Sequence, residues 1–396
     1  MRIKSISVNH FKSLVNFKID LAKFNCLVGL NGSGKSTFLQ FVDFLTHLMK
    51  GDIDTWFKRR DWKTSDIYNH LDKKKSIDFT VEVVDDAGKN LTWKSRYYLK
   101  WGCRFEEVII EGIRFYTFRK KNETRRHYGL WDALNKTTTY GTRINFKYQG
   151  SILSALGDEN IPKAFYDFRD FIASMESFEL LAPHFLRQRT RESEGSIGLE
   201  GKGLASFLHE MNEANRRKIV EQLFVVYPQL DSINIKKLRA GWKQIDIKEK
   251  FNETVLNSES RHVNDGMLRL IAILAQLQSN RRVIVFEEIE NGIIPESVGF
   301  LLGELINTEK QVVVTTHSPI ILNYLDDETA IPGVHFFYKT PEGFTQTVPF
   351  LSVPDMREKL EVMGPGEAFI DTNLTELANR LSQQRSASAS MEGKER

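Results

Sequence analysis

The stretch GLNGSGKST, residues 29–37, decides how the rest of the chain is interpreted. It matches the pattern G-x-x-x-x-G-K-[S/T] at every fixed position. A short apolar run, residues 24–28, precedes it, and apolar residues recur at helical spacing over residues 38–49. A strand, a glycine-rich turn and a helix N-terminus direct backbone N–H groups and a positive dipole end at one point. The sequence therefore predicts a P-loop that binds a nucleoside triphosphate.

The side chains of this loop have distinct expected roles. Lys35 is expected to reach the β- and γ-phosphates of ATP, and the Ser36 hydroxyl to ligate Mg²⁺. The other predicted nucleotide-binding residues of the loop are Asn31, Gly32, Ser33, Gly34 and Thr37. ATP and Mg²⁺ are therefore the expected cofactors.

The composition is that of an ordinary globular protein. The length of 396 residues suggests two or three domains, or one elaborated domain with inserts. The residues are 41% hydrophobic and 27% charged, which allows an ample core. The formal net charge of +3 is close to balance, so the overall charge gives no argument for a nucleic-acid partner. Two cysteines, Cys26 and Cys103, and the lack of any apolar run near membrane-spanning length predict a cytoplasmic protein without a membrane partner.

The first part of the chain is expected to be rich in strands. Apolar residues alternate over residues 3–8 and 15–21, which predicts a strand pair around a turn at 9–14. Strand-like runs follow at residues 76–84, 91–99, 107–113 and 143–148. They predict an antiparallel sheet inserted between the P-loop helix and the rest of the core.

Two polar residues here each allow two interpretations. Lys12, in the turn before the P-loop, either folds back onto the nucleotide or is a solvated turn lysine. Gln149, at the junction between the inserted sheet and a helical region, either senses Mg²⁺ and the γ-phosphate or caps a helix. The sequence leaves both alternatives open.

Residues 160–260 are expected to be mainly helical, with a glycine-rich, loop-like stretch at 187–203. Basic residues gather in and near this stretch, where they form either a solvated face or a surface for DNA. They are Arg187, Arg189, Arg191, Lys202, Arg216, Arg217, Lys218, Lys236 and Lys237. The Ser/Gln/Lys-rich tail, residues 381–396, is expected to be disordered.

Two strongly apolar strands carry the remaining catalytic candidates. Residues 283–286 run directly into Glu287 and Glu288, and residues 312–316 run into His317. Such strands suit a parallel sheet that is buried on both faces, with chemistry at the carboxyl ends. Glu287 is expected to hold Mg²⁺, Glu288 to polarise the attacking water as general base, and His317 to hydrogen-bond the γ-phosphate.

A second anion-binding turn opens the apolar helix at residues 268–277. Asn264, Asp265 and Gly266 place small polar residues and a glycine at its N-terminus. One ATP cannot use both this turn and the P-loop of the same chain if the order follows ABC-type heads. The sequence therefore predicts a head-to-tail pair, in which the Gly266 turn of each chain closes over the ATP of the other.

The order of P-loop, Gln149, the Asn264–Gly266 turn, the paired glutamates and His317 resembles that of ABC-type ATPases. The chain resembles their RecF/SMC-like branch, in particular stand-alone bacterial AAA-type ATPases related to the OLD-family ATPase domain and to anti-phage defence ATPases. The likeness covers most of the chain. Further stretches that carry it are residues 3–6, 9–13, 201–208, 286–292 and 363–369.

The chain departs from this family pattern at a few positions. Asn264 replaces the usual signature serine, and Glu287 replaces the usual Walker B aspartate. Ile289 and Ile294 stand where proline and histidine are common. Asn264 can still donate a hydrogen bond and Glu287 can still bind Mg²⁺, so the departures concern turnover rather than nucleotide binding. No Toprim-like acidic array follows His317, so the OLD nuclease half is not expected.

The resemblance implies an α/β fold: a P-loop NTPase of ABC-head type with an inserted antiparallel β-sheet and a helical subdomain. The expected divisions are a first ATPase lobe at 1–150, the helical subdomain at 151–260, a second ATPase lobe at 261–380, and the tail.

The resemblance also implies an ATPase that forms a homodimer or higher homo-oligomer. One hypothesis is a regulator that holds and releases a separately encoded effector protein, a nuclease or toxin, in phage defence. The alternative is a DNA-binding repair ATPase of RecF type. An ABC transporter subunit is a weaker third hypothesis, because the N-terminal strand pair and the large insert argue against it. DNA stimulation of the ATPase, and a neighbouring gene for a nuclease or toxin, distinguish the first two.

Overall fold

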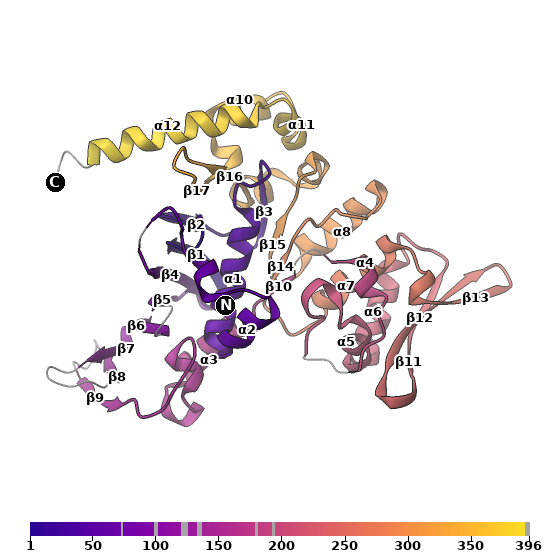
Figure 1. Cartoon of the computed structure of the whole chain (residues 1–396). Helices are drawn as coiled ribbons and strands as arrows, with labels where there is room; N and C mark the ends of the chain where they lie inside the picture. The colour runs from indigo at the N-terminus through magenta and orange to yellow at the C-terminus, as the bar shows by residue number, and fades with distance from the viewer. Residues whose placement is uncertain are drawn as a thin grey trace.

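The computed structural model describes residues 1–72, 74–98, 102–119, 126–132, 137–178, 181–191 and 195–392. The fold is α/β, and its strands form sheets of six, eight and three strands within this described part (Figure 1). None of the described helices is both long and apolar enough to cross a membrane.

The six-stranded sheet contains the strands that the sequence predicts to carry the chemistry. Its order is β10-β14-β15-β3-β16-β17, and all neighbours are parallel except β16 and β17. The strands are β10 (Glu176–Phe178), β14 (Val283–Phe286), β15 (Gln311–Thr315), β3 (Phe24–Gly29), β16 (Val334–Lys339) and β17 (Thr345–Pro349). Because β14, β15 and β3 are adjacent and parallel, their carboxyl ends meet at one edge.

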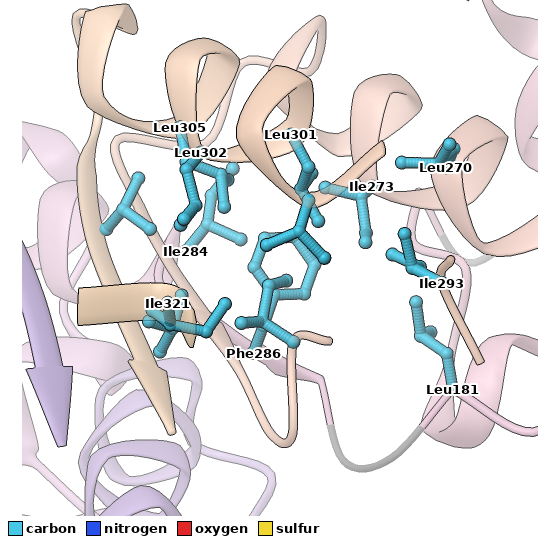
Figure 2. Packing of buried hydrophobic residues seen from close by; sticks show 14 of the residues in the cluster. Leu181, Leu270, Ile273, Ile284, Phe286, Ile293, Leu301, Leu302, Leu305 and Ile321 are labelled. Carbon is cyan, nitrogen blue, oxygen red and sulfur yellow. The ribbon is translucent and has the colours of Figure 1, made fainter. Parts of the chain in front are cut away.

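One face of this sheet packs on α7 (Asp265–Leu277) and α8 (Pro295–Asn307). Figure 2 shows Ile284 and Phe286 of β14 beside Leu301 and Leu302 of α8. The intervening residues of β14, Val283 and Val285, belong to a second buried cluster on the opposite face. Burial on both faces explains why the strand is apolar at every position.

The opposite face packs on α1 (Lys35–Lys50), which lies between the six-stranded sheet and the eight-stranded antiparallel sheet. Helix α1 is buried over most of its circumference, with Phe38, Phe41 and Leu45 fully enclosed. A helix that is apolar on nearly all sides is stable only when it is covered on nearly all sides. The P-loop therefore leads into the most enclosed helix of this half of the molecule.

The eight-stranded sheet has the order β2-β1-β4-β5-β6-β7-β8-β9. Its strands are β1 (Arg2–Asn9), β2 (Phe17–Asp20), β4 (Ser76–Val84), β5 (Asn90–Tyr98), β6 (Gly102–Ile110), β7 (Ile113–Arg119), β8 (Arg126–Asp132) and β9 (Thr137–Arg143). The predicted N-terminal strand pair is confirmed, and the inserted strands extend the same sheet through the pairing of β1 with β4. The expected strand at residues 143–148 is wrong, because β9 ends at Arg143.

The other helices are α2 (Ile53–Arg59), α3 (Lys163–Ala173), α4 (Pro183–Leu186), α5 (Leu204–Glu210), α6 (Glu213–Leu223), α9 (Asp327–Gly333), α10 (Pro354–Leu360), α11 (Pro365–Ile370) and α12 (Leu374–Glu392). Helix α12 contradicts the expected disorder of the tail up to Glu392, and residues 393–396 lie outside the described residues. Helix α12 is anchored to the rest of the protein at two places. Leu377 and Ala378 are buried in its first turns, and Arg385, near its middle, donates to the Asn16 carbonyl at 2.8 Å.

The expectation of a mainly helical region at 160–260 is wrong for residues 230–259. They form a three-stranded antiparallel sheet of β11 (Leu230–Lys237), β12 (Lys243–Phe251) and β13 (Thr254–Glu259), which projects from one side of the molecule (Figure 1). The isoleucines at positions 233 and 235 pair with those at 247 and 245 across β11 and β12. This period-two pattern is present in the sequence, but the charged residues between the isoleucines obscure it.

A buried carboxyl group joins the inserted sheet to the chain that follows it. Glu106, fully buried on β6, accepts hydrogen bonds from Trp93 Nε1 at 3.0 Å, from Ile152 N at 2.8 Å and from the Ser151 hydroxyl. Burial raises the pKa of Glu106, and the hydrogen bonds partly oppose that shift.

We predict that Glu106→Ala destabilises the protein by about 2–4 kcal/mol, because it leaves three buried donors unpaired. Urea unfolding followed by tryptophan fluorescence measures this loss. Glu106→Gln retains an acceptor and should recover part of the stability. Glu111→Ala, which removes an exposed ion pair with Lys89, should change stability by less than about 0.5 kcal/mol. Equal losses in the Glu106→Ala and Glu111→Ala variants would contradict the role of Glu106.

Candidate functional site

The P-loop connects β3 to α1 through glycines whose conformation excludes other residues. Gly29 has φ 143°, and a Cβ there would lie 2.3 Å from the Phe337 carbonyl oxygen. Gly34 has φ 109°, and a Cβ there would lie 2.1 Å from Thr345 Oγ1. Both the backbone angles and the close contacts therefore require glycine.

Thr345, the first residue of β17, holds the P-loop through hydrogen bonds. Its hydroxyl donates to the Ser33 carbonyl at 2.9 Å and lies 2.8 Å from the Ser13 hydroxyl. The Thr345 amide also donates to the Ser13 carbonyl at 2.8 Å. Thr345 could not be identified from the sequence, because it lies 312 positions beyond Ser33 and has no motif around it.

Lys35 places its ammonium group inside the loop. Lys35 Nζ donates to the carbonyl oxygens of Gly29 at 2.8 Å and Leu30 at 3.2 Å, and the residue is 6% exposed. Burial lowers the pKa of Lys35 to about 8, although the carboxylates of Glu287, Glu288 and Glu290 act in the opposite direction. The first amides of α1 have no acceptor within the helix, so they and this ammonium form an anion-binding cradle. Asn31, Gly32 and Thr37 occupy the rest of the same loop and first turn.

The Ser36 hydroxyl donates to the Glu287 carboxylate, directly across from the end of β14. Magnesium in phosphate-transfer sites is held by one or two protein oxygens together with phosphate oxygens. The two oxygen donors fit Mg²⁺ on this criterion. In the described part of the chain there is no cluster of three or more His, Cys, Asp or Glu residues that could hold a metal without a phosphate.

Glu288 lies in a strained turn immediately after β14. Its φ of 47° is in the left-handed region, which costs about 1–3 kcal/mol for a residue with a side chain. Hydrogen bonds hold this conformation: the Glu288 amide donates to Thr315 Oγ1 at 2.9 Å, and Asn291 Nδ2 donates to Glu288 Oε2 at 3.2 Å. Neither Thr315 nor Asn291 was singled out from the sequence.

His317 lies beside Glu288, as predicted for residues at the ends of adjacent strands. His317 Nε2 is 4.0 Å from Glu288 Oε1, and both side chains are partly exposed. Glu290 sets this position, because its Oε1 accepts from the amides of His317 at 2.9 Å and Ser318 at 3.2 Å. The other oxygen, Glu290 Oε2, is buried without a hydrogen-bond partner in the described structure. In the sequence, Glu290 is one residue of the stretch 286–292 and no pattern marks it separately.

The structure contradicts the solvated interpretation of Lys12, whereas contact of Lys12 with the nucleotide stays a prediction. Lys12 Nζ donates to Gln40 Oε1 of α1 at 2.9 Å and lies 3.5 Å from the centre of the Trp62 ring. It is therefore bound to protein groups rather than solvated. Gln40 is one helical turn beyond Ser36, so the ammonium lies beside the P-loop helix and not in the loop itself.

Gln149 does not belong to this site, so its assignment to Mg²⁺ and the γ-phosphate is wrong. Gln149 contacts Asp54 through two hydrogen bonds, Nε2 to Oδ2 at 2.6 Å and the Asp54 amide to Oε1 at 3.2 Å. The adjoining Ser151 amide donates to the Leu48 carbonyl, in the last turn of α1. The 16 residues of α1 separate Gln149 from the P-loop by about 24 Å.

The Asn264–Gly266 turn begins α7 and makes no hydrogen bond or ion pair with the P-loop within the described structure. Asn264 caps the helix by accepting from the Met267 amide at 2.8 Å, and Asp265 pairs with Arg187. Asn264 and Asp265 are exposed. The turn is therefore available on the surface and does not complete the pocket of its own chain.

Arg269, one turn further along α7, packs under the loop that carries Glu288. An added Cβ at Gly292 would lie 3.1 Å from Arg269 Nε, which is buried without a hydrogen-bond partner in the described structure. Burial lowers the pKa of Arg269, while the nearby charges of Asp265 and Glu288 oppose the shift. This arginine physically connects the exposed turn to the loop of the paired glutamates. The sequence shows Arg269 only as a single arginine in an apolar helix, and this pattern does not predict its contact with the loop of the paired glutamates.

We predict that ATP binding weakens above pH 8. The lowered pKa means that Lys35 loses its charge as the pH rises through about 8, and the phosphates bind the charged form. Below that pH the full affinity is present. Calorimetric titration should show dissociation constants on the order of tenfold larger at pH 9 than at pH 7.5. An affinity that is constant to pH 10 would contradict this environment for Lys35.

Solved structures similar to this chain are heads of SMC proteins. One is an SMC head bound to the C-winged helix domain of ScpA, with 16% identity and a TM-score of 0.54, covering 88% of this chain and 98% of that one. Another, from Pyrococcus furiosus, is an SMC head with an extended coiled coil bound to the C-terminal domain of ScpA. The identity is 13% and the TM-score 0.53. The alignment covers 91% of this chain and 99% of the SMC chain. At this identity the likeness shows the fold.

No curated protein matches the sequence significantly. A family model does match, over residues 24–323, and it is described as an AAA domain, putative AbiEii toxin, type IV TA system. The matched region contains the P-loop, the paired glutamates and His317. The fold is that of SMC head domains. The family match covers more than half of the chain, which therefore belongs to this AAA family.

Proposed function

We propose that this protein binds and hydrolyses ATP with Mg²⁺ as a pair of chains around two nucleotides. The pair passes the resulting conformational change to a separately encoded effector in anti-phage defence. The observation that carries the proposal is the meeting of Ser36 with Glu287, and of Glu288 with His317, at one edge of the parallel sheet.

Each group at this edge has a definite task in the proposed reaction. Lys35 and the first amides of α1 bind the phosphates, and Ser36 and Glu287 supply oxygens for Mg²⁺. Glu288 accepts a proton from the attacking water, since its carboxylate lies at the exposed mouth of the site. His317, adjacent to Glu288, contacts the γ-phosphate and responds to its departure. The strained turn at Glu288 holds the base in a fixed direction.

The surface around the site supports pairing of two chains. Three large apolar residues are exposed on the loops that surround the site: Leu30 at 40%, Ile294 at 56% and Ile320 at 40%. They lie in the P-loop, in the segment after the paired glutamates, and after His317, respectively. A second copy that brings its Gly266 turn onto this edge would cover them and supply the second anion-binding turn.

The effector part of the proposal is supported by the family and by the fold. The family description itself reads putative AbiEii toxin of a type IV TA system, so it describes one component of a system with more than one component. SMC heads of similar fold are bound to domains of ScpA, so heads of this architecture bind partner proteins. We infer that the partner here is a nuclease or toxin, encoded next to this gene. Copurification of that neighbouring product with the tagged chain tests the inference.

The alternative, a DNA-binding RecF-type repair ATPase, depends on the basic residues near 187–203. Two of these arginines are engaged within the chain, Arg187 with Asp265 and Arg189 with Glu259 at 3.8 Å. This favours the effector hypothesis over DNA contact. Stimulation of the ATPase by duplex DNA at physiological salt would reverse that preference.

We predict that Glu288→Gln retains ATP binding and lowers the hydrolysis rate on the order of 10²–10⁴-fold, because the amide cannot accept the proton. Phosphate release measures the rate, and gel filtration with ATP should show a trapped closed assembly. Glu309→Gln, at an exposed position after α8, is the control and should hydrolyse normally. Near-normal turnover by Glu288→Gln would place the general base elsewhere.

A mixed pair tests the shared pocket. Lys35→Ala should lose ATP affinity, and Gly266→Asp should set a carboxylate against the γ-phosphate of the partner chain, so each pure variant should lack hydrolysis. In a mixed pair one pocket carries both changes and the other carries none. An equal mixture should then recover about a quarter of the wild-type rate if the pockets act independently.

Two controls accompany this experiment. Differently tagged chains establish that mixed pairs form. Gly266→Ala adds only a Cβ, 3.0 Å from the Gly292 carbonyl oxygen, and so reports the local steric effect alone. An ATP-bound structure in which Gly266 contacts the ATP of its own chain would refute the shared pocket.

A further inference from the structure

A second cavity lies at the far end of α1 from the P-loop. Its volume is about 870 Å³, within the range of small-molecule sites. Three segments line it: the end of α1 with the start of α2, the strands β5, β6 and β8, and the chain around residues 146–155. Gln149, which the structure removes from the ATP site, lies in its wall. The length of α1 separates the cavity from the P-loop by about 24 Å, so the P-loop nucleotide cannot occupy it.

The charge of the lining favours an anion. Four cationic side chains, Lys50, Arg104, Arg126 and Lys147, face two carboxylates, Asp52 and Asp54. Both carboxylates are already hydrogen-bonded, since Asp52 accepts from His47 Nδ1 at 2.7 Å and Asp54 accepts from Gln149. The described lining therefore holds more cationic than acidic side chains, and both carboxylates already accept hydrogen bonds.

Arg126 is the strongest indication of a ligand. Its half-buried guanidinium donates to two neutral acceptors, the Cys103 carbonyl at 3.2 Å and Thr117 Oγ1 at 2.8 Å. In the part of the chain that the structure describes, no carboxylate forms an ion pair with it. Burial lowers the pKa of Arg126, and the adjacent positive charge of Arg104 contributes in the same direction. Two neighbouring guanidinium groups at a cavity wall suit a phosphate, which accepts their paired N–H donors.

Glu106 makes no hydrogen bond to Arg126 in the described structure. Its carboxyl oxygens accept from Trp93, Ser151 and Ile152, so the attraction between Glu106 and Arg126 acts only through space. A half-buried guanidinium that contacts only neutral acceptors can still form charge-assisted hydrogen bonds with an anion. Arg126 is therefore available to an anionic group that enters the cavity.

Aromatic side chains complete the lining. Phe146, which is 42% exposed, and Tyr148 lie with ring centres 6.2 Å apart at the cavity wall, and the Tyr148 hydroxyl donates to the Cys103 carbonyl at 3.3 Å. The same carbonyl accepts from Arg126, so an aromatic surface adjoins the guanidinium group. Planar bases stack on such rings. Gln149 and Asp54 add polar groups that can hydrogen-bond a ribose or a base edge.

We propose that this cavity binds a free nucleotide, distinct from the ATP of the P-loop, with its phosphate on Arg104 and Arg126 and its base against Phe146 and Tyr148. The proposal does not depend on hydrolysis at the P-loop. It assigns to the inserted sheet a ligand site that contacts the last turn of the P-loop helix through Lys50.

Photolabelling of the full chain with 8-azido-AMP tests the proposal, because peptide mapping separates the two sites. We expect label on peptides that contain residues 146–148. Free AMP should compete with it, and the same concentration of inorganic phosphate should not. Arg126→Met should lower this labelling at least tenfold. Lys147→Ala, at an exposed position where folding is not at risk, should lower it severalfold. Lys94→Ala, an exposed lysine outside the cavity, is the matched control and should label normally.

Three outcomes would overturn the proposal. The first is label confined to P-loop peptides. The second is labelling at 146–148 that Lys147→Ala and Arg126→Met leave unchanged. The third is equal competition by phosphate and AMP, which would exclude a nucleotide as the specific ligand.

Discussion

The parallel pairing of β14, β15 and β3 is the constraint on which the site depends. Val314 of β15 is in register with Phe286 of β14 on one side and with Cys26 of β3 on the other. Each of these residues lies within a few positions of a catalytic candidate, so the register sets the relative heights of the P-loop, the paired glutamates and His317. A slip of one residue would turn every side chain to the opposite face and separate these groups. Burial of both faces makes such a slip costly, because alternate residues pack on α1 and on the α7–α8 layer.

Helix α1 transmits this constraint through the molecule. It is enclosed between two sheets, with its N-terminus in the P-loop and its C-terminus against Gly150, where an added Cβ would lie 2.2 Å from the Leu48 carbonyl oxygen. A helix enclosed on nearly all sides is close-packed along its length. The second cavity and the ATP site therefore lie at the two ends of one well-packed element.

Several polar groups near the site remain without partners inside well-packed surroundings. Ser33 Oγ, Glu290 Oε2 and Arg269 Nε are buried and lack hydrogen bonds within the described structure. Such groups are costly in a protein interior unless a change of state or a ligand satisfies them. All three adjoin loops that surround the paired glutamates or the phosphate cradle, together with the left-handed turn at Glu288. The loops around the site therefore carry buried unpaired atoms and a left-handed turn, although both features also occur elsewhere in the described structure.

The sequence by itself determined the P-loop, the buried strands that lead into Glu287 and His317, and the N-terminal strand pair. These features depend on short-range patterns: glycine spacing, a run of apolar residues, a change of period. Only the tertiary structure decided the positions of Gln149, Thr345, Glu290 and Arg269. Gln149 was placed by its order along the chain, whereas folding brings it to the opposite end of α1. Thr345 and Arg269 act through contacts between segments that are distant in the sequence. The sheet of residues 230–259 was missed because charged residues obscure the alternation of apolar and polar residues in its strands. Long-range contacts of this kind leave no local signal, because the chemistry that selects them exists only once the partner segments meet.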